Sequence, residues 1–169
     1  MKIYYREKSG GIEILRCFGI EGRVEIPGMI DDKLVISAAP YAFSSHMDEK
    51  EELKNASLWE VSEGLGFGRE EHVLAGNDVE EIVFPYTLKE IGRYIFYGCG
   101  NLKKLEFSDS LMQIGCGAFT GCHALEKLTV HMEQGKKSGV KEMLGEMWQR
   151  IDVNFLYEYE ERCFQRNLL

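Results

Sequence analysis

The side chains with the widest chemical repertoire in this sequence are its five cysteines and four histidines. Cys116, Cys122 and His123 lie close together, but their spacing fits no recognised zinc-binding pattern. The histidines contain no H-x-x-x-H pair, the spacing that places two metal ligands on one face of a helix. We therefore expect no bound metal and no other cofactor. The cysteines are Cys17, Cys99, Cys116, Cys122 and Cys163, and the histidines are His46, His72, His123 and His131.

Glycine-rich stretches in the chain do not complete a catalytic motif. Gly135-Lys136-Lys137-Ser138 resembles the end of a phosphate-binding loop, G-x-x-x-x-G-K-[ST]. However, Val130 stands where the first glycine belongs, and a second lysine precedes the serine. The glycines between residues 64 and 68 follow no strand and open no helix, which argues against a dinucleotide site. The chain has no G-x-S-x-G elbow, and no carboxylate stands in the apolar sequence background typical of a general acid. We predict a protein that is not an enzyme.

An internal repeat of 23 residues decides which elements hold these side chains. Residues 79–101 align with residues 102–124, and a third unit begins with Leu125, Leu128 and Val130. Self-similarity at a period of 20–29 residues is typical of leucine-rich repeats. The matched pairs are Val79 with Leu102, Ile82 with Leu105, Phe84 with Phe107, Leu88 with Leu111, Ile91 with Ile114, Gly92 with Gly115, Phe96 with Phe119, Gly98 with Gly121, and Cys99 with Cys122.

Each repeat reads as a short strand, a turn and a return leg. The apolar residues at its first, fourth and sixth positions end in a two-residue alternation, which suits a strand with one buried face. The turn contains Pro85 in one unit and Ser108 in the next, and glycines close the return leg. One unit cannot bury its own apolar edge, so the units must stack into a continuous core.

The motifs of residues 79–132 resemble the BspA-type leucine-rich repeats, whose unit reads roughly L-x-x-L-x-I-P-x-x-V-x-x-I-G-x-x-A-F-x-G-C-x-x. The sequence departs from that unit at Ile95, Ser108 and Ala124. The resemblance implies an α/β repeat fold, a short leucine-rich-repeat solenoid wound as a right-handed β-α superhelix. It also implies a bacterial interaction module, since the family is known chiefly for binding and cell-surface adhesion.

The whole chain is predicted to form one leucine-rich-repeat domain. In the N-terminal hairpin, a turn at Lys8–Gly11 joins two apolar stretches. In the degenerate first repeat, Ile36 takes the place of the repeat isoleucine, Ser37 takes that of the glycine, and two extra residues precede Phe43. The predicted segments are a hairpin cap at 1–19, a degenerate first repeat at 20–47, an acidic insertion at 48–76, repeats at 77–132, and a C-terminal cap of helix and strand at 133–169.

Two segments break the repeat pattern. Residues 47–59 are predicted to form a helix, followed by a glycine-rich stretch at 63–69. Apolar residues from Val140 to Trp148 recur at helical spacing, and those from Ile151 to Tyr159 alternate as in a strand. The predicted buried contacts of the first helix are Met47, Leu53, Ala56, Leu58 and Trp59. The predicted buried residues of the C-terminal elements are Val140, Met143, Leu144, Met147, Trp148, Ile151, Val153, Phe155, Tyr157 and Tyr159.

The net charge of −8 is concentrated in residues 48–81, which hold 11 acidic and 3 basic residues. This run is either a solvated face or a docking surface for a basic partner. The acidic balance argues against sequence-independent binding of nucleic acid and against an anionic membrane surface. The N-terminus has no apolar segment typical of an export signal, and the cysteine count is odd. We therefore expect a cytoplasmic protein with reduced thiols.

The polar residues between the buried ones of each repeat strand are predicted to line an open sheet face, where they bind a protein partner or are simply solvated. Cys99 and Cys122 share one repeat position and are expected to be small buried hydrophobes. One alternative is an enzyme or small-molecule site between the insertion at 48–72 and the C-terminal element, and a second is self-association, giving a possible homodimer. The predicted binding residues are Glu81, Val83, Lys104, Glu106, Lys127 and Thr129, stacked as the columns Glu81-Lys104-Lys127 and Val83-Glu106-Thr129. The loop tyrosines Tyr86, Tyr94 and Tyr97 are expected to be exposed.

Overall fold

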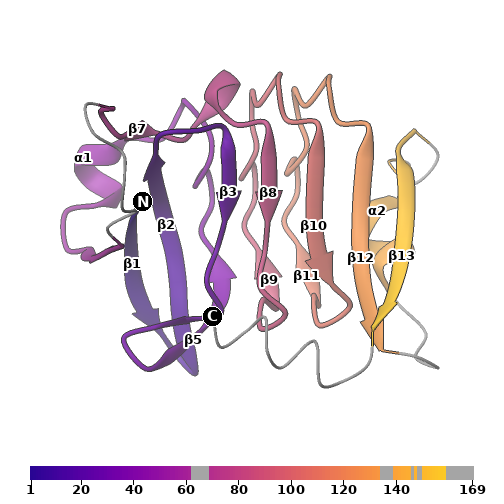
Figure 1. The fold of residues 1–169 in the computed structure, drawn as a ribbon, viewed down its shortest axis with the longest axis horizontal. Helices are drawn as coiled ribbons and strands as arrows, with labels where there is room; N and C mark the ends of the chain where they lie inside the picture. Colours follow the sequence, from indigo (N-terminus) through magenta and orange to yellow (C-terminus); the bar gives the residue numbers. More distant parts are fainter. Residues whose placement is uncertain (62–68, 134–138, 146, 148–149, 159–169) are drawn as a thin grey trace.

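A computed structural model describes residues 1–61, 69–133, 139–145, 147 and 150–158 (Figure 1). In the described part of the chain, the short helices α1 (Glu49–Glu52) and α2 (Val140–Leu144) and the 3-10 turn η1 (Gly76–Asp78) accompany the strands. The strands are β1 (Lys2–Lys8), β2 (Gly11–Gly19), β3 (Arg23–Glu25), β4 (Met29–Ile30), β5 (Lys33–Ala38), β6 (Ser57–Glu60), β7 (His72–Val73), β8 (Glu81–Val83), β9 (Glu90–Ile91), β10 (Lys104–Ser108), β11 (Gln113–Ile114), β12 (Lys127–Glu133) and β13 (Asp152–Glu158).

The strands form two sheets with the core between them. The first sheet has five parallel strands in the order β13-β12-β10-β8-β3. The second has eight strands along the order β11-β9-β5-β2-β1-β6, with β4 paired to β5 and β7 paired to β2. The return legs are the short strands β9 and β11 rather than helices. The fold is therefore a β-solenoid of about five turns with few helices, consistent with a leucine-rich-repeat solenoid, and not the predicted alternation of strands and helices.

The repeat period of 23 residues equals one step across the five-stranded sheet. Ile82 pairs in register with Leu105, and Leu105 pairs with Leu128. All three side chains are buried. Val24 precedes them in this buried ladder and Val153 follows them. The observed register confirms the sequence alignment of the repeats.

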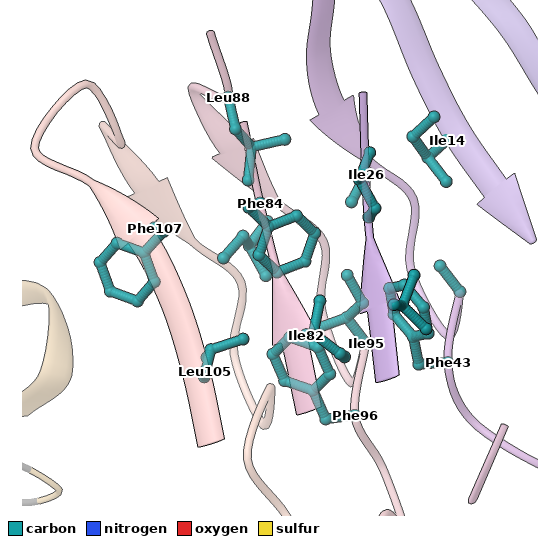
Figure 2. Close-up of a cluster of buried hydrophobic side chains, with 14 of the residues drawn as sticks. Ile14, Ile26, Phe43, Ile82, Phe84, Leu88, Ile95, Phe96, Leu105 and Phe107 are labelled. Atoms are coloured by element: carbon teal, nitrogen blue, oxygen red, sulfur yellow. The ribbon is translucent and has the colours of Figure 1, made fainter. Parts of the chain in front are cut away.

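A row of phenylalanine side chains from successive turns lies within the aliphatic core, and Figure 2 shows Phe43 and Phe96 of this row. The ring of Phe96 lies 6.0 Å from that of Phe43, 6.2 Å from that of Phe84 and 5.7 Å from that of Phe119. Phe96 and Phe43 are fully buried, and Phe119 packs against the cluster. Phe43, Phe96 and Phe119 occupy equivalent positions of successive turns. The contacts between their rings therefore link each turn to the next through the core.

The first repeat is more regular than the sequence predicts. Ala38 pairs with Ile91 across β5 and β9, so Ala38 rather than Ile36 occupies the isoleucine position. Ala39 then takes the place of the repeat glycine, and no extra residues precede Phe43. The backbone N–H of Ala39 donates to the carbonyl oxygen of Ile14 on β2. The predicted placement of Ile36 and Ser37 was wrong because alanine stands at both positions where the other repeats have isoleucine and glycine.

The acidic insertion differs from the predicted helix of residues 47–59. Helix α1 spans only four residues and buries none of them, and β6 then pairs antiparallel with β1 at the edge of the eight-stranded sheet. The side chain of Leu58 is 44% exposed, whereas that of Trp59 packs against the core. The alternation of β6 explains why only one of these two neighbours, the half-buried Trp59, faces the core. The predicted glycine-rich stretch lies mostly outside the described residues.

Arg16 on β2 ties the insertion to the first turn of the solenoid. Its buried guanidinium donates hydrogen bonds to the carbonyl oxygens of Ala42 at 3.1 Å and Ser44 at 2.6 Å. It also contacts a carboxylate oxygen of Glu49 on α1 at 3.0 Å. Burial lowers the pKa of this guanidinium, and the Glu49 carboxylate opposes that shift. The described part of the insertion thus lies beside the N-terminal hairpin.

At the other end of the stack, β13 runs parallel to β12, and α2 lies next to β11. Val140 and Leu144 of α2 and Ile151 are buried, as predicted, and Val153 and Phe155 pack against the same core. Trp148 and Tyr159, also predicted to be buried, lie outside the described residues. No helix in the described part of the chain is long and apolar enough to cross a membrane.

Candidate functional site

The five-stranded sheet faces the reader in Figure 1, and the described elements leave its outer face uncovered. Strand register arranges the residues of this face in two rows, because side chains alternate between the two faces of each strand. The first row is Arg23, Glu81, Lys104, Lys127 and Asp152. The second row is Glu25, Val83, Glu106, Thr129 and Asn154. The structure thus brings together all six predicted face residues.

Charge along the first row is only partly neutralised. The Nζ atom of Lys104 lies 2.9 Å from a carboxylate oxygen of Glu81 on the neighbouring strand. Lys103, one residue before Lys104, lies 3.5 Å from Glu80 in the same way. Lys127 is exposed and makes no ion pair within the described residues. The row therefore offers one cation that an incoming carboxylate can reach without breaking an existing pair.

The second row is less open than predicted. Thr129 is only 5% exposed, although its register position between Glu106 and Asn154 places it on the outer face. Thr129 therefore contributes little surface to a partner. The prediction that it lines an open face was wrong, since strand alternation gives the direction of a side chain but not its exposed fraction.

His131 is a feature of this face that the sequence prediction did not include. Its Nε2 atom lies 3.0 Å from a carboxylate oxygen of Glu106, and the ring of Tyr86 meets its imidazole edge-on with centroids 5.4 Å apart. The side chain of His131 is buried. The signal that could have found it is the repeat itself, because residue 131 pairs in register with Ser108. Tyr86 is half-buried, as are Tyr94 and Tyr97, so the predicted exposure of these rings is only partial.

Cys99 and Cys122 bridge successive turns. The thiol of Cys99 donates to the carbonyl oxygen of Phe43 at 3.2 Å, and that of Cys122 donates to the carbonyl oxygen of Phe96 at 3.3 Å. Cys99 is fully buried and Cys122 is half-buried. Burial raises the pKa of each thiol to about 12, as it does for Cys17. These thiols act as small apolar residues that also hydrogen-bond, while Cys163 lies outside the described residues.

The raised thiol pKa values predict a loss of stability at alkaline pH. An unfolded thiol ionises near its ordinary pKa of 9.0, whereas buried Cys17 stays protonated up to about 12. Between these values the unfolded chain releases more protons, so its free energy falls relative to the folded state. A fully buried thiol then lowers the free energy of unfolding by up to about 1.4 kcal/mol per pH unit.

Chemical unfolding at a series of pH values measures this effect. The wild-type protein should lose stability steadily from about pH 9 upwards, and Cys122→Ala should flatten that decline. Cys116→Ala is the matched control, because Cys116 is exposed and its removal should leave the slope unchanged. A wild-type stability that stays constant from pH 9 to pH 11 would contradict the burial of these thiols.

Of the residues considered for metal or nucleotide chemistry, the described ones are not brought into a metal site. Within the described residues, no group of three or more histidine, cysteine, aspartate or glutamate side chains could hold a metal ion. The predicted partial phosphate loop at 135–138 and the glycines at 64–68 lie outside the described residues. The alternative site between the insertion and the C-terminal element is also not formed by described residues. Strand β6 lies at one end of the solenoid and β13 at the other (Figure 1).

Comparison with protein families gives a match over most of the repeat region. Residues 70–167 match the BspA type Leucine rich repeat region, with six copies of the repeat. The chain belongs to the BspA-type leucine-rich repeat family. Leucine-rich repeats generally mediate protein–protein interactions, and a non-catalytic module is consistent with this BspA-type chain.

One solved structure similar to this BspA-type chain is the crystal structure of a T. pallidum leucine-rich repeat protein. It shares 22% sequence identity, with a TM-score of 0.38, and the alignment covers 91% of this chain and 79% of that chain. The comparison with curated proteins found no match.

Proposed function

We propose that this BspA-type chain is a non-catalytic module that binds another protein through the outer face of the five-stranded sheet. The observation that carries the proposal is the register of β8, β10 and β12, which stacks polar side chains over three turns on a face that no described element covers. A flat sheet face with regularly spaced side chains offers a partner a large and rigid contact area. The location of the protein in the cytoplasm stays a prediction.

The contact residues we assign are Glu81, Val83, Lys104, Glu106 and Lys127. The half-buried Val83 gives the centre of the face an apolar element, and the charged residues surround it. Protein interfaces commonly combine such a less polar centre with a polar rim. Exposed Lys127 serves as the anchor for a carboxylate of the partner, because it makes no ion pair within the described residues.

Charge reversal on the sheet face tests this proposal. The double variant Lys104→Glu, Lys127→Glu should lower capture of the partner from a native lysate at least about ten-fold, the effect of losing one or two charge-assisted contacts. Its melting curve should stay close to that of the wild type, because the exposed Lys104–Glu81 pair is worth only about 1 kcal/mol or less.

The matched control for charge reversal is Lys54→Glu, Lys89→Glu, which makes the same charge change at exposed lysines away from this face. This control should leave capture unchanged. Equal capture by both double variants would remove the sheet face from the proposal.

The acidic insertion is the second candidate surface. Glu51 and Glu52 of α1 are exposed, and α1 contributes no buried residue to the core. A basic partner would be attracted to these carboxylates at low ionic strength. Loss of capture in Glu51→Lys, Glu52→Lys, together with normal capture by the sheet-face variant, would move the binding surface to the insertion.

A further inference from the structure

A groove of about 410 Å³ opens on the eight-stranded sheet, apart from the face assigned to the protein partner. Its lining comes from β1, β2, β5, β9 and β11 and from the corners that follow the last three strands. The glycines Gly92 and Gly115 form part of its wall, at points where each turn lies against the backbone of the preceding one. Pro40, Arg93 and Cys116 stand at equivalent corner positions along one side of the groove.

The groove is built around a buried polar row. Glu13 and Ser37 are both at least nine-tenths buried, and they pair in register across β2 and β5. The hydroxyl of Ser37 donates to a carboxylate oxygen of Glu13 at 3.1 Å. The Nε atom of Arg6 donates to the other oxygen of Glu13 at 2.6 Å. The register continues this row through Glu90 on β9 to Gln113 on β11.

Both carboxylates of the groove already have cationic partners. Lys8 reaches in from β1, where its Nζ atom lies 3.5 Å from Glu13 and forms an ion pair with Glu90. The hydrogen bond to Glu90 raises the pKa of Lys8, so the ammonium stays charged at neutral pH. These contacts hold Glu13 and Glu90 in place and leave neither carboxylate available to attract a cation.

Arg93 has no such partner. Its side chain is exposed at the rim, and within the described residues it makes no ion pair. The lining holds two cations, Lys8 and Arg93, and Arg6 pairs with Glu13 from outside the lining. Arg93 is therefore the lining cation that is left without an ion pair among the described residues. An arginine guanidinium binds a carboxylate through two parallel hydrogen bonds. The half-buried ring of Pro40, at the equivalent corner of the preceding turn, gives the groove an apolar contact on the side of Arg93.

We propose that this groove binds a carboxylate group carried on a short apolar stem, with Arg93 as the cationic anchor. The stem packs on the ring of Pro40, and the exposed amide of Gln113 lies within the same lining. The one unpaired guanidinium fits a single carboxylate, and it repels an amine. The carboxylate belongs either to a small carboxylic acid or to a peptide end, and both present the same chemistry to Arg93.

Cys116 supplies a probe inside the groove. Its exposed thiol lines the same space as Arg93. Iodoacetate and iodoacetamide alkylate a thiolate by the same displacement, in which a carbon–sulfur bond forms and iodide leaves. Only iodoacetate carries a carboxylate, so an anchor at Arg93 should favour it selectively. The ratio of the two alkylation rates at Cys116 is measured by peptide mass spectrometry, with the urea-unfolded chain as the reference.

We expect this ratio to be at least about ten-fold higher in the folded protein than in the unfolded chain, since a charge-assisted pair contributes binding energy of that order. Arg93→Gln should return the ratio to the unfolded value, whereas Arg150→Gln, at an exposed arginine outside the groove, should leave it unchanged. An equal ratio in the wild type and in Arg93→Gln would overturn the proposal.

Protection experiments distinguish the two sources of the carboxylate. Butyrate should slow the alkylation of Cys116 by iodoacetamide if the ligand is a small acid, and butyramide should not. A short peptide with a free C-terminal carboxylate should protect more strongly than butyrate if the ligand is a peptide end, and its amidated form should not protect. Absence of protection by both butyrate and the peptide at millimolar concentration would also overturn the proposal.

Discussion

Gly92→Ala should destabilise the solenoid by about 3 kcal/mol or more, the upper range for forcing extra volume into a packed site. A β-carbon at residue 92 would lie 2.4 Å from the backbone nitrogen of Pro40 and 2.5 Å from the carbonyl carbon of Ala39. Both atoms belong to the backbone of the preceding turn, so neither can move aside as a flexible side chain could. The two turns would have to separate along the stack.

Urea unfolding of Gly92→Ala and Gly139→Ala provides the comparison. Gly139 precedes α2, and a β-carbon there would meet no atom within 4 Å. Its replacement should therefore change the free energy of unfolding little. The same reasoning applies to Gly115, whose β-carbon would lie 2.2 Å from the backbone nitrogen of Arg93. Equal unfolding midpoints for the variants at 92 and 139 would show that the turns are not in such close contact.

Phe96→Ala should cost about 3–5 kcal/mol, the range for removing a buried aromatic ring. The ring of Phe96 is fully buried and contacts the rings of Phe43, Phe84 and Phe119. Its loss leaves a cavity at the point where three turns meet, and rigid neighbouring strands limit how far the site can collapse. The total stability of a natural domain is about 5–15 kcal/mol, so much of this variant should be unfolded at physiological temperature.

Thermal unfolding followed by circular dichroism measures the effect of Phe96→Ala. Met112→Ala serves as the control, because Met112 is 75% exposed and its truncation removes few contacts. The melting temperature of Met112→Ala should stay within a few degrees of the wild-type value. A melting temperature of Phe96→Ala equal to that of Met112→Ala would contradict the phenylalanine row as the link between turns.

The parts of the fold that follow the repeat could be predicted from the sequence. The pairing of Ile82 with Leu105 and Leu128 follows directly from the 23-residue period, because each step of the period is one step across the sheet. The same period predicted that Lys104 and Lys127 lie side by side on the outer face. Burial of Cys99 also follows from its repeat position, since equivalent positions face the same core.

The features that differ from prediction depend on contacts between segments that are not related by the 23-residue repeat. The insertion forms β6 because the open edge of β1 offers hydrogen bonds to it, although its sequence favours a helix. The polar groove could not be predicted from the sequence for a similar reason. Glu13 belongs to the N-terminal hairpin and Glu90 to a repeat, and only the pairing of β2 with β5 and of β5 with β9 brings them together.

Site-specific photo-crosslinking tests most directly the central claim that a partner protein lies on the five-stranded sheet. A photoreactive phenylalanine analogue is placed at position 127 in one sample and at position 89 in another. Both lysines are exposed, but Lys127 lies on β12 of the five-stranded sheet, whereas Lys89 directly precedes β9 of the eight-stranded sheet. The claim predicts a covalent partner adduct from position 127 and none from position 89. An adduct from position 89 with none from position 127 would contradict it.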